Sequence, residues 1–452
     1  MTHPPTHLFA RALRTHGAVF AAYAAIAIAI TWPLVLRLGT VVPHDAGDPV
    51  LNAWILGWNA HQVPMSRAWW NAPIFFPARG AMAFSEHLLG ISVFATPIQW
   101  LGGSPLFAYN VIFLLSFPVS AFAAHLLVYS LTRRHDAAIL AGLAFGFSPY
   151  RIVHTPHLQV LVAWWMPVAL LALHTYARTR RIRWLVLFGA AWLLQALSNG
   201  YYMLFFSVLV GLWLLWFLPP WRQPRAFLAT MAAWAVAAVP FVPLLMGYRE
   251  IQRSFGMSRS VGEIEVFSAD VTSVLNSSPL LAFWRFPPSL RRPEGEMFFG
   301  LTVVVCVTAG VAWAWARRAV PAEPDGSPSP RSGSSRWLRT GLWAAAAISA
   351  LVAASLLAFG PWQVRVLGQS LSVARLHKPL SIVFLSLLGL ILSSSLVRTS
   401  YARASVPGFY ALGAAVMWLF CLGPTVRLLG TRIWYKAPYG RHPWGTRSRS
   451  SV

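Results

Sequence analysis

The sequence is poor in acidic residues and in charged residues of any kind. Of its 452 residues only 12 are aspartate or glutamate, and the four charged residue types together make up 11%. A soluble globular protein carries about 25% charged residues, because it has to hydrate its whole surface. The composition therefore argues against a soluble protein and indicates a chain that lies largely in a membrane.

Cysteine is almost absent as well. The two cysteines, Cys306 and Cys421, both lie inside apolar segments. Neither a disulfide framework nor a cysteine-ligated metal site is supported by two thiols in such positions. We interpret both as small buried side chains.

What the sequence has in abundance is long apolar segments, and 57% of its residues are hydrophobic. Segments that approach or pass 18 residues match the thickness of a bilayer core, and 23 tryptophans suit the two membrane–water interfaces. We predict an all-α polytopic membrane protein with about 11 transmembrane helices. The predicted spans are 18–36, 106–131, 137–147, 160–176, 184–197, 201–218, 227–246, 297–315, 337–359, 379–397 and 408–423.

Basic residues outnumber acidic ones, and the formal net charge is +24. The arginines lie in short loops between apolar segments, as the positive-inside rule predicts. We therefore interpret them as topology signals and contacts with anionic membrane lipids, and expect no nucleic-acid binding. The rule places the N-terminus in the cytoplasm. It also makes 88–101, which Pro97 interrupts, an interfacial helix in the first external loop, since a further span there would put Arg133 and Arg134 outside.

Changes in composition predict the division of the chain. A segment rich in proline, serine and glycine is predicted to be a disordered cytoplasmic linker. The basic tail ends without structure signals, and we expect truncation there. The predicted parts are a membrane core at 1–318 with external loops 37–104 and 247–296, the linker at 319–336, C-terminal transmembrane helices at 337–425 and the tail at 426–452.

The few acidic residues gather in the two predicted external loops, and none lies in the middle of a predicted span. Ion-coupled transporters usually carry ionisable groups at mid-membrane depth. The distribution indicates chemistry at an external surface, although a transporter without ion coupling remains an alternative.

Two carboxylates, Asp45 and Asp48, follow the first predicted span in a turn with Gly47 and Pro49. Such a pair can bind a divalent cation, the one cofactor that we consider, or can supply a general base. The alternative is an ordinary turn in which Asp48 caps the following helix. Further along the loop, Glu86 and His87 either reach the same cavity or merely favour a helix terminus.

A second polar segment holds Arg151, His154 and His157. An arginine with two imidazoles suits a phosphate group, because the guanidinium makes bidentate hydrogen bonds. Two histidines three residues apart can also bind a metal. A wet interfacial loop is the alternative, and Pro156 makes a regular helix here unfavourable.

These motifs resemble those of the GT-C class of membrane glycosyltransferases, which includes the protein O-mannosyltransferases and the bacterial aminoarabinose transferase. The resemblance is to an uncharacterised bacterial branch of that superfamily and covers most of the chain. It rests on HDAGDP at 44–49, FSEH at 84–87, FSPYR at 147–151 with the two histidines that follow, and SNGYY at 198–202.

The resemblance implies an inverting enzyme of the cell envelope, located in the bacterial cytoplasmic (inner) membrane. It would take its sugar from a polyprenyl-phosphate donor on the non-cytoplasmic face. Asp45 or Asp48 would be the general base, and Glu86 would support the acceptor or a metal. The donor phosphate would be held by Arg151 with His154 or His157, and His87 would be a further substrate-binding residue. The family's usual Asp-Glu pair is here Asp-Ala-Gly-Asp, which leaves the base open between the two aspartates. Alternatives are a transporter or flippase of a lipid-linked glycan, or an inactive truncated remnant.

Overall fold

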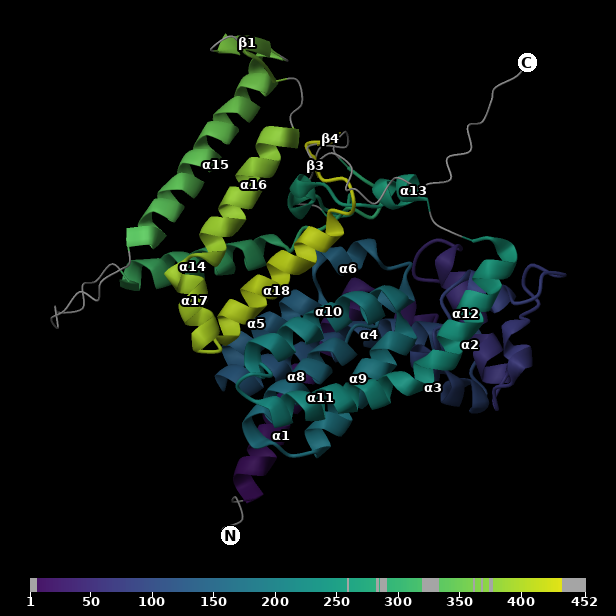
Figure 1. Cartoon of the computed structure of the whole chain (residues 1–452). Helices are drawn as coiled ribbons and strands as arrows, with labels where there is room; N and C mark the ends of the chain where they lie inside the picture. The colour runs from purple at the N-terminus through teal and green to yellow at the C-terminus, as the bar shows by residue number, and fades with distance from the viewer. Residues whose placement is uncertain are drawn as a thin grey trace, which may run out of the picture. The chain divides into compact units, whose positions relative to one another are not determined.

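The computed structural model describes residues 6–257, 260–281, 284, 291–318, 333–360, 362–366, 369–373 and 377–432. The chain divides into two compact units (Figure 1). The first comprises 1–258, 277–283 and 299–304, and the second comprises 259–276, 284–298 and 305–452. Of the predicted linker, 319–332 lie outside the described residues, and its last four residues already belong to a helix.

The first unit is helical throughout its described residues. Its elements are α1 (Thr6–Ile30), η1 (Leu34–Leu36), α2 (Asp48–His61), η2 (Arg67–Trp70), η3 (Ala81–Phe84), α3 (Leu89–Trp100), α4 (Pro105–Thr132), α5 (His135–Gly146), α6 (Pro149–Val153), α7 (Leu158–Leu161), α8 (Trp165–Thr179), α9 (Arg183–Ser198), α10 (Gly200–Phe217), α11 (Pro224–Ala238), η4 (Val239–Phe241) and α12 (Val242–Phe255).

Among the described residues, five helical stretches are long and apolar enough to cross a membrane. Helix predominates and strands are confined to two small hairpins, which agrees with the predicted all-α membrane protein. The five stretches are Pro105–Thr132, Leu158–Thr179, Gly200–Phe217, Pro224–Phe255 and Trp337–Leu356. Five further apolar helices have 10–17 residues. The number of full-length spans is thus smaller than the predicted 11. Predicted span 137–147, for example, is the 12-residue α5, about 18 Å long, whereas a bilayer core is about 30 Å thick.

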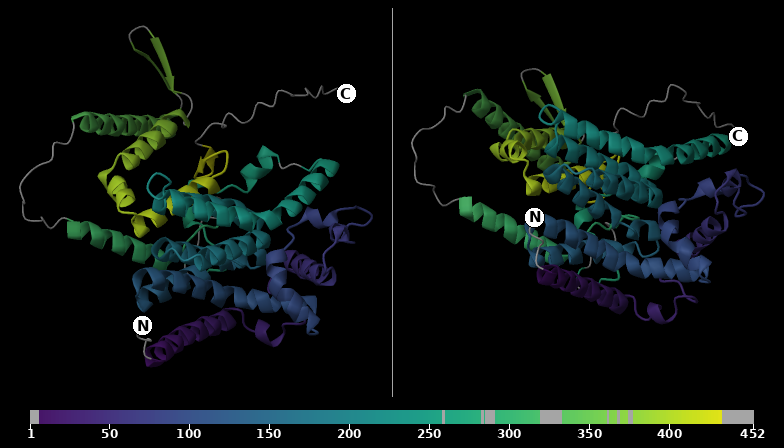
Figure 2. Two further views of the ribbon diagram at one scale, coloured as in Figure 1. Left: turned by 60° about the horizontal axis from the view of Figure 1, so that its bottom comes forward. Right: turned by 90° about the horizontal axis from the view of Figure 1, so that it is seen from below.

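Helix α4 is the centre of the first unit and packs against α1, α2, α3, α5 and α8. Figure 2 shows α1 and α4 side by side at one edge of the bundle. Two glycines bring α5 close to α4: a Cβ atom on Gly146 would lie 2.5 Å from the Cβ of Ala121, and one on Gly142 would lie 2.8 Å from its carbonyl oxygen. A short helix packed this tightly is stabilised by its neighbour and not by its own length.

The predicted first external loop folds into α2, the short turns η2 and η3, and α3. Helix α3 has 12 residues and contains Pro97, which agrees with the predicted short helix. Buried Asn59 joins these elements: its Nδ2 donates to the carbonyl of His87 and to Ser92 Oγ, each at 2.8 Å, and its Oδ1 accepts from Trp69 Nε1. Satisfied on all sides, Asn59 fixes the path of the loop.

Helix α12 continues past Met246, the end of the predicted span, to Phe255. It lies against the first loop through close contacts. A Cβ atom on Gly247 would lie 2.1 Å from the ring of Trp70, and Ile251 fits over Gly80. Tyr248 donates from its hydroxyl to the carbonyl of Ser85 at 3.0 Å.

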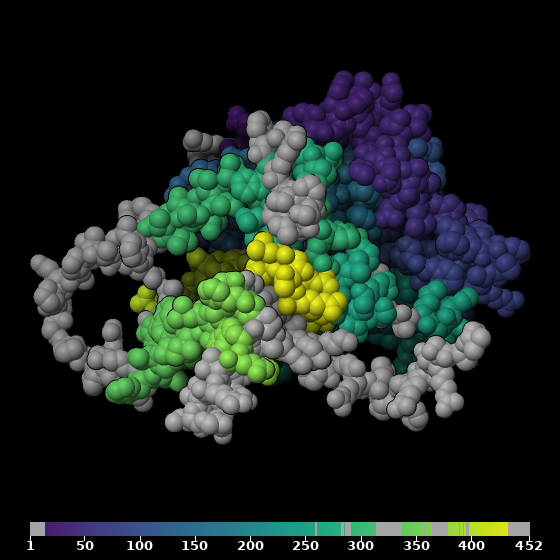
Figure 3. Space-filling model, turned by 90° about the horizontal axis from the view of Figure 1, so that it is seen from above, coloured from purple at the N-terminus to yellow at the C-terminus, as the bar shows by residue number. Residues whose placement is uncertain are grey.

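The second unit holds most of the C-terminal helices and two small hairpins. Its elements are α13 (Val261–Val266), η5 (Val271–Leu275), the greater part of α14 (Leu301–Arg318), α15 (Gly333–Phe359), β1 (Trp362–Val366), β2 (Gln369–Val373), α16 (His377–Leu392), α17 (Ser395–Ala402), α18 (Val406–Cys421), β3 (Arg427–Leu428) and β4 (Thr431–Arg432). Helices α15 and α16 pack side by side, and the antiparallel hairpin β1–β2 lies between them in the sequence. In Figure 3 the green and yellow-green atoms of this part of the chain lie against one another.

Two acidic side chains of the predicted second external loop hold the hairpin β3–β4. Glu265 is paired with Arg427 at 3.6 Å and with Arg432 at 2.9 Å. Asp270 accepts from the backbone N–H groups of Leu429 and Gly430 at 3.1 and 2.9 Å. These acids therefore have a structural role.

The prediction that both cysteines are buried is wrong, because Cys306 and Cys421 are exposed at the surface of the chain. Sequence shows that a residue lies in an apolar helix but not which side of the helix packs against protein. In a membrane protein an exposed apolar side faces lipid, so exposure here needs no contact with water.

Candidate functional site

Asp45 closes the turn before α2. Its Oδ1 accepts the backbone N–H of Gly47 at 2.8 Å, and its Oδ2 lies 2.7 Å from Nδ1 of His44. The Gly47 N–H and then His44 hold the pKa of this carboxyl below its usual range. The side chain is 59% exposed. Both carboxylate oxygens of Asp45 therefore contact residues of its own turn.

Asp48 is the first residue of α2, and the N-cap position belongs to Gly47, which corrects the alternative in which Asp48 caps the helix. Its Oδ2 lies 3.1 Å from Nε2 of His157. The Nδ1 of His157 lies in turn 3.1 Å from Nδ1 of His154. The structure therefore joins the two sequence motifs in one series, from a half-exposed carboxylate through two imidazoles into the interior.

The segment with Arg151 and the two histidines is not a wet loop. Arg151 and His154 are 4% and 5% exposed. The Arg151 Nη2 donates to the carbonyl of Ser116 at 2.9 Å, and its guanidinium lies 5.0 Å from the centre of the Phe117 ring. Both residues belong to α4. Burial lowers the pKa of Arg151 to about 10, and burial with the neighbouring His157 lowers that of His154 to about 4.

Three hydrogen bonds fold this segment into the bundle. Asn52 of α2 donates to Gln159 Oε1 at 3.1 Å. Tyr202 of α10 donates from its hydroxyl to the carbonyl of Val160 at 3.0 Å, and Gln195 of α9 donates to the carbonyl of Val162 at 2.9 Å. Pro149 and Pro156 leave α6 a single turn, and beyond it the carbonyls of Val160 and Val162 take side chains as their partners.

Glu86 connects the first loop to α10. Its Oε1 accepts the backbone N–H of Gly200 at 3.0 Å, at the start of the helix that Asn199 caps. Burial raises the pKa of Glu86 to about 7, against the Gly200 N–H, and the charge of Asp48 adds to the rise. Glu86 is therefore close enough to Asp48 for the two carboxyls to influence one another.

His87 has a different environment from its neighbour Glu86. Its Nδ1 accepts the backbone N–H of Leu89 at 3.1 Å at the start of α3, and its ring lies 6.0 Å from those of Phe241 and Tyr248. Burial lowers its pKa to about 4. These contacts explain His87 as a neutral residue that supports the helix terminus.

Several buried polar atoms around this series have no hydrogen-bond partner among the described residues. They are Glu86 Oε2, Tyr109 Oη, Arg151 Nε and His154 Nε2. Sequence reasoning missed Tyr109, which lies within α4, because a tyrosine inside an apolar span gives no signal that it faces a polar neighbour. A buried polar group without a partner costs about 1–3 kcal/mol, so this group of atoms is suited to meeting a polar ligand.

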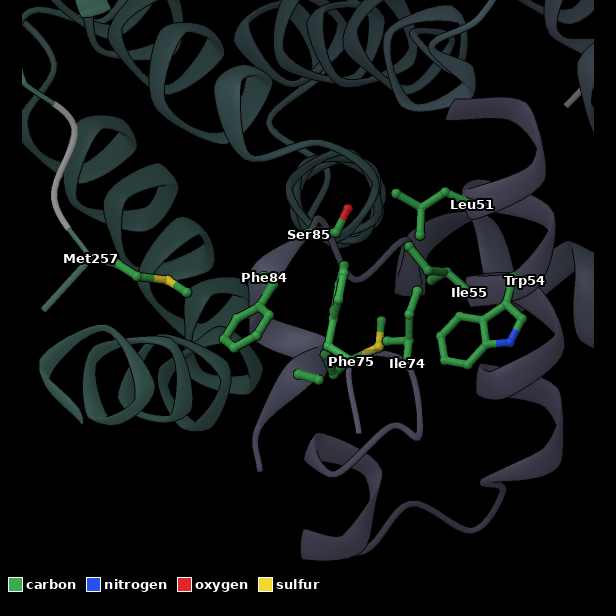
Figure 4. Close-up of a pocket in the computed structure, with 10 residues that line it drawn as sticks. Leu51, Trp54, Ile55, Ile74, Phe75, Phe84, Ser85 and Met257 are labelled. Carbon is green, nitrogen blue, oxygen red and sulfur yellow. The ribbon is translucent and has the colours of Figure 1, made fainter. Parts of the chain in front are cut away.

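An apolar cavity of about 230 Å³ lies between α2 and the loop that leads to Glu86. Leu51, Trp54 and Ile55 line it from α2, and Phe75, Phe84 and Met257 line it from other segments (Figure 4). Ser85, the neighbour of Glu86, is part of its wall. An apolar cavity beside a few polar groups is the usual form of a ligand site.

A divalent cation on Asp45 and Asp48 would need further ligands. Within the described ranges, no group of three histidine, cysteine or acidic ligand atoms includes either aspartate. Each carboxylate already has a histidine neighbour, His44 or His157. The pair therefore does not form a ready cation site.

Comparison with known proteins gives a family and no activity. No curated protein matches the chain. A family model described as "Domain of unknown function (DUF6311)" matches residues 55–361. This match begins after Asp48 and includes Glu86, Arg151 and both histidines of the series. It covers well over half of the sequence, and the chain therefore belongs to the DUF6311 family.

Proposed function

We propose that the protein is a membrane glycosyltransferase that moves a sugar from a polyprenyl-phosphate donor to an acceptor on the non-cytoplasmic face. The observation that carries the proposal is the series from Asp48 through His157 and His154, with buried Arg151 in the same segment. It combines a carboxylate that can accept a proton with a cation that can hold a phosphate.

Arg151 is the phosphate-binding residue in this proposal. No carboxylate pairs with it in the part of the chain that the structure describes, and its Nε atom has no hydrogen-bond partner there. An unpaired buried cation is costly and marks a functional position in a membrane protein. A phosphate oxygen on the guanidinium would supply the missing charge and hydrogen bond.

Asp48 is the general base, and His157 positions it. The Asp48 carboxylate takes the proton of the acceptor hydroxyl, whose oxygen attacks the anomeric carbon from the face opposite the phosphate. The bond from this carbon to the phosphate oxygen breaks, and polyprenyl phosphate leaves with the electron pair. Arg151 stabilises the charge that develops on the leaving phosphate, and the configuration at carbon inverts.

Glu86 supports the acceptor. Its Oε1 is held by Gly200, whereas its buried Oε2 has no partner among the described residues and can bond to a hydroxyl. The apolar cavity beside Ser85 suits a hydrocarbon chain, as a lipid-linked donor requires. The proposal includes the predicted orientation, with the N-terminus cytoplasmic and this site at the opposite side of a bacterial inner membrane.

The test is sugar transfer or donor hydrolysis by the purified protein in nanodiscs, with a panel of polyprenyl-phosphate sugars. We expect release of polyprenyl phosphate by the wild type, a loss of about 100-fold or more in Asp48→Asn, and weaker binding of polyprenyl phosphate by Arg151→Gln. A folded wild type that neither turns over nor binds any donor would overturn the proposal. Movement of a lipid-linked glycan across the bilayer without bond cleavage would then favour a flippase.

A further inference from the structure

Three histidines from three helices meet in the first unit, away from the site described above. His16 belongs to α1, His125 to α4 and His135 is the first residue of α5. Along α4, His125 lies nine residues beyond Ser116, the residue that holds Arg151, which is about 13 Å of helix. The three-histidine cluster is therefore a separate feature and does not depend on the proposed function.

The three rings converge. Their centroids are 5.2 Å apart for His16 and His135, 5.3 Å for His16 and His125, and 5.8 Å for His125 and His135. One nitrogen from each ring lies within 4.8 Å of the other two. In a tetrahedral zinc site with bonds of about 2.0–2.1 Å, the ligand nitrogens are about 3.3 Å apart. Side-chain rotations that move the ring nitrogens by a little over an ångström would bring them to the spacing of a metal site.

The buried ring nitrogens of these histidines lack hydrogen-bond partners among the described residues, and this favours a bound ligand. His125 is completely buried, and neither of its ring nitrogens has a hydrogen-bond partner in the described structure. The Nδ1 atoms of His16 and His135 are also buried and without a partner. Each such group costs about 1–3 kcal/mol, a cost that a purely aromatic cluster would not have.

The neighbours of the rings are aromatic. His125 stacks on Phe122 with centroids 5.9 Å apart, and His135 stacks on Tyr129 at 4.3 Å. The nearest acid in sequence, Asp136, is exposed and paired with Arg134. Imidazole ligands without carboxylates suit Zn²⁺, Cu²⁺ or Ni²⁺ and do not suit Mg²⁺ or Ca²⁺, which prefer oxygen.

We propose that His16, His125 and His135 bind one divalent transition-metal ion, with Zn²⁺ as the representative ion. Three protein ligands leave the fourth tetrahedral position to a water molecule. The ion joins α1 to the α4–α5 pair through covalent coordination. By the predicted orientation the cluster lies near the cytoplasmic ends of these helices, so the ion enters from the cytoplasm.

The test is metal binding by tag-free protein in nanodiscs after treatment with a chelator. Co²⁺ reports the geometry, since a tetrahedral site gives strong visible absorption bands, and Zn²⁺ displaces it. We expect one equivalent of Co²⁺ with tetrahedral bands in the wild type, and affinity lower by about tenfold or more in His16→Gln and His125→Gln. His61→Gln is the control, because His61 is exposed and outside the cluster.

His135→Gln provides a variant at a helix start, so that the proposal stays testable if His125→Gln does not fold. Retention of monodisperse elution by size exclusion establishes folding for each variant. Co²⁺ bands that are equal in the wild type and in a folded cluster variant would overturn the proposal. So would a wild type that binds no more Co²⁺ than empty nanodiscs.

Discussion

Asp45 and Asp48 lie three residues apart, but the structure gives them different surroundings. Asp45 is bonded within its own turn, whereas Asp48 points to His157 and the buried segment. We therefore expect Asp48→Asn to lower sugar transfer by about 100-fold or more, and Asp45→Asn to lower it by less than about tenfold. Initial rates with a saturating donor compare them. The reverse order would make Asp45 the base.

The titration of Glu86 should make the free energy of unfolding depend on pH. Its pKa is about 7 in the folded protein and 4.5 in the unfolded chain. Between these values the folded state holds a proton that the unfolded state has released, so the free energy of unfolding falls as the pH rises from about 4.5 to 7. Glu86→Gln keeps an acceptor for the Gly200 N–H and removes the titration.

As the pH rises, the midpoint of thermal unfolding of the wild type should fall relative to that of Glu86→Gln. We expect the difference, Glu86→Gln minus wild type, to be about 2 °C larger at pH 8 than at pH 5. The difference between the two proteins removes the contributions of the other titrating groups, which they share. Parallel profiles would show that Glu86 does not titrate in this range.

For single residues, the sequence predicted which motifs come together better than it predicted the surroundings of each side chain. The four quoted motifs lie together, because Asp48 contacts His157, Glu86 contacts Gly200, and Tyr202 contacts Val160. The burial of Arg151 was not predictable, since a single arginine between apolar segments looks like an interfacial residue. The contact with Ser116 shows that the segment folds inward.

Among the elements, α12 depends on a glycine. A Cβ atom on Gly247 would lie 2.1 Å from Trp70, so Gly247→Ala should force the helix away from the loop. We expect overpacking to lower the free energy of unfolding by about 1–3 kcal/mol, measured by thermal unfolding in detergent.

Gly211→Ala is the matched control for this substitution. Gly211 lies inside α10, and a Cβ atom there would meet nothing within 4 Å. Alanine should stabilise that helix by up to about 1 kcal/mol. If both variants lose stability equally, the contact with Trp70 does not explain the effect of the first.

Element lengths were the least predictable part of the fold. Hydropathy identified the apolar segments, but α5 is too short to span and α12 continues nine residues past Met246. Hydropathy does not distinguish an apolar segment that faces lipid from one that packs against protein. Where a helix ends depends on partners such as Gly146 with Ala121, which are distant in sequence.

The orientation of the whole molecule is open to direct measurement. In a protein with Cys306 and Cys421 replaced by serine, we expect Ser66→Cys to react with an impermeant maleimide in intact cells. Thr179→Cys, next to the basic loop, should react only after permeabilisation, because the positive-inside rule keeps that loop in the cytoplasm. Both positions are exposed. Labelling in the opposite pattern would invert the predicted topology.

The contact of Arg151 with Ser116 has an electrical consequence. Ser116 lies eleven residues after Pro105 in a helix of 28 residues, about 16 Å along a length of about 42 Å. Moving one charge across the whole bilayer changes its energy by about 2.3 kcal/mol per 100 mV. In the proposed orientation, with α4 spanning the bilayer, an anion that enters from outside to Arg151 would cross about a third of the field. Against a potential that is negative inside, its affinity falls about fourfold per charge at 100 mV. On the proposed function and orientation, a phosphate-bearing ligand should therefore bind more tightly in a de-energised vesicle than in an energised one.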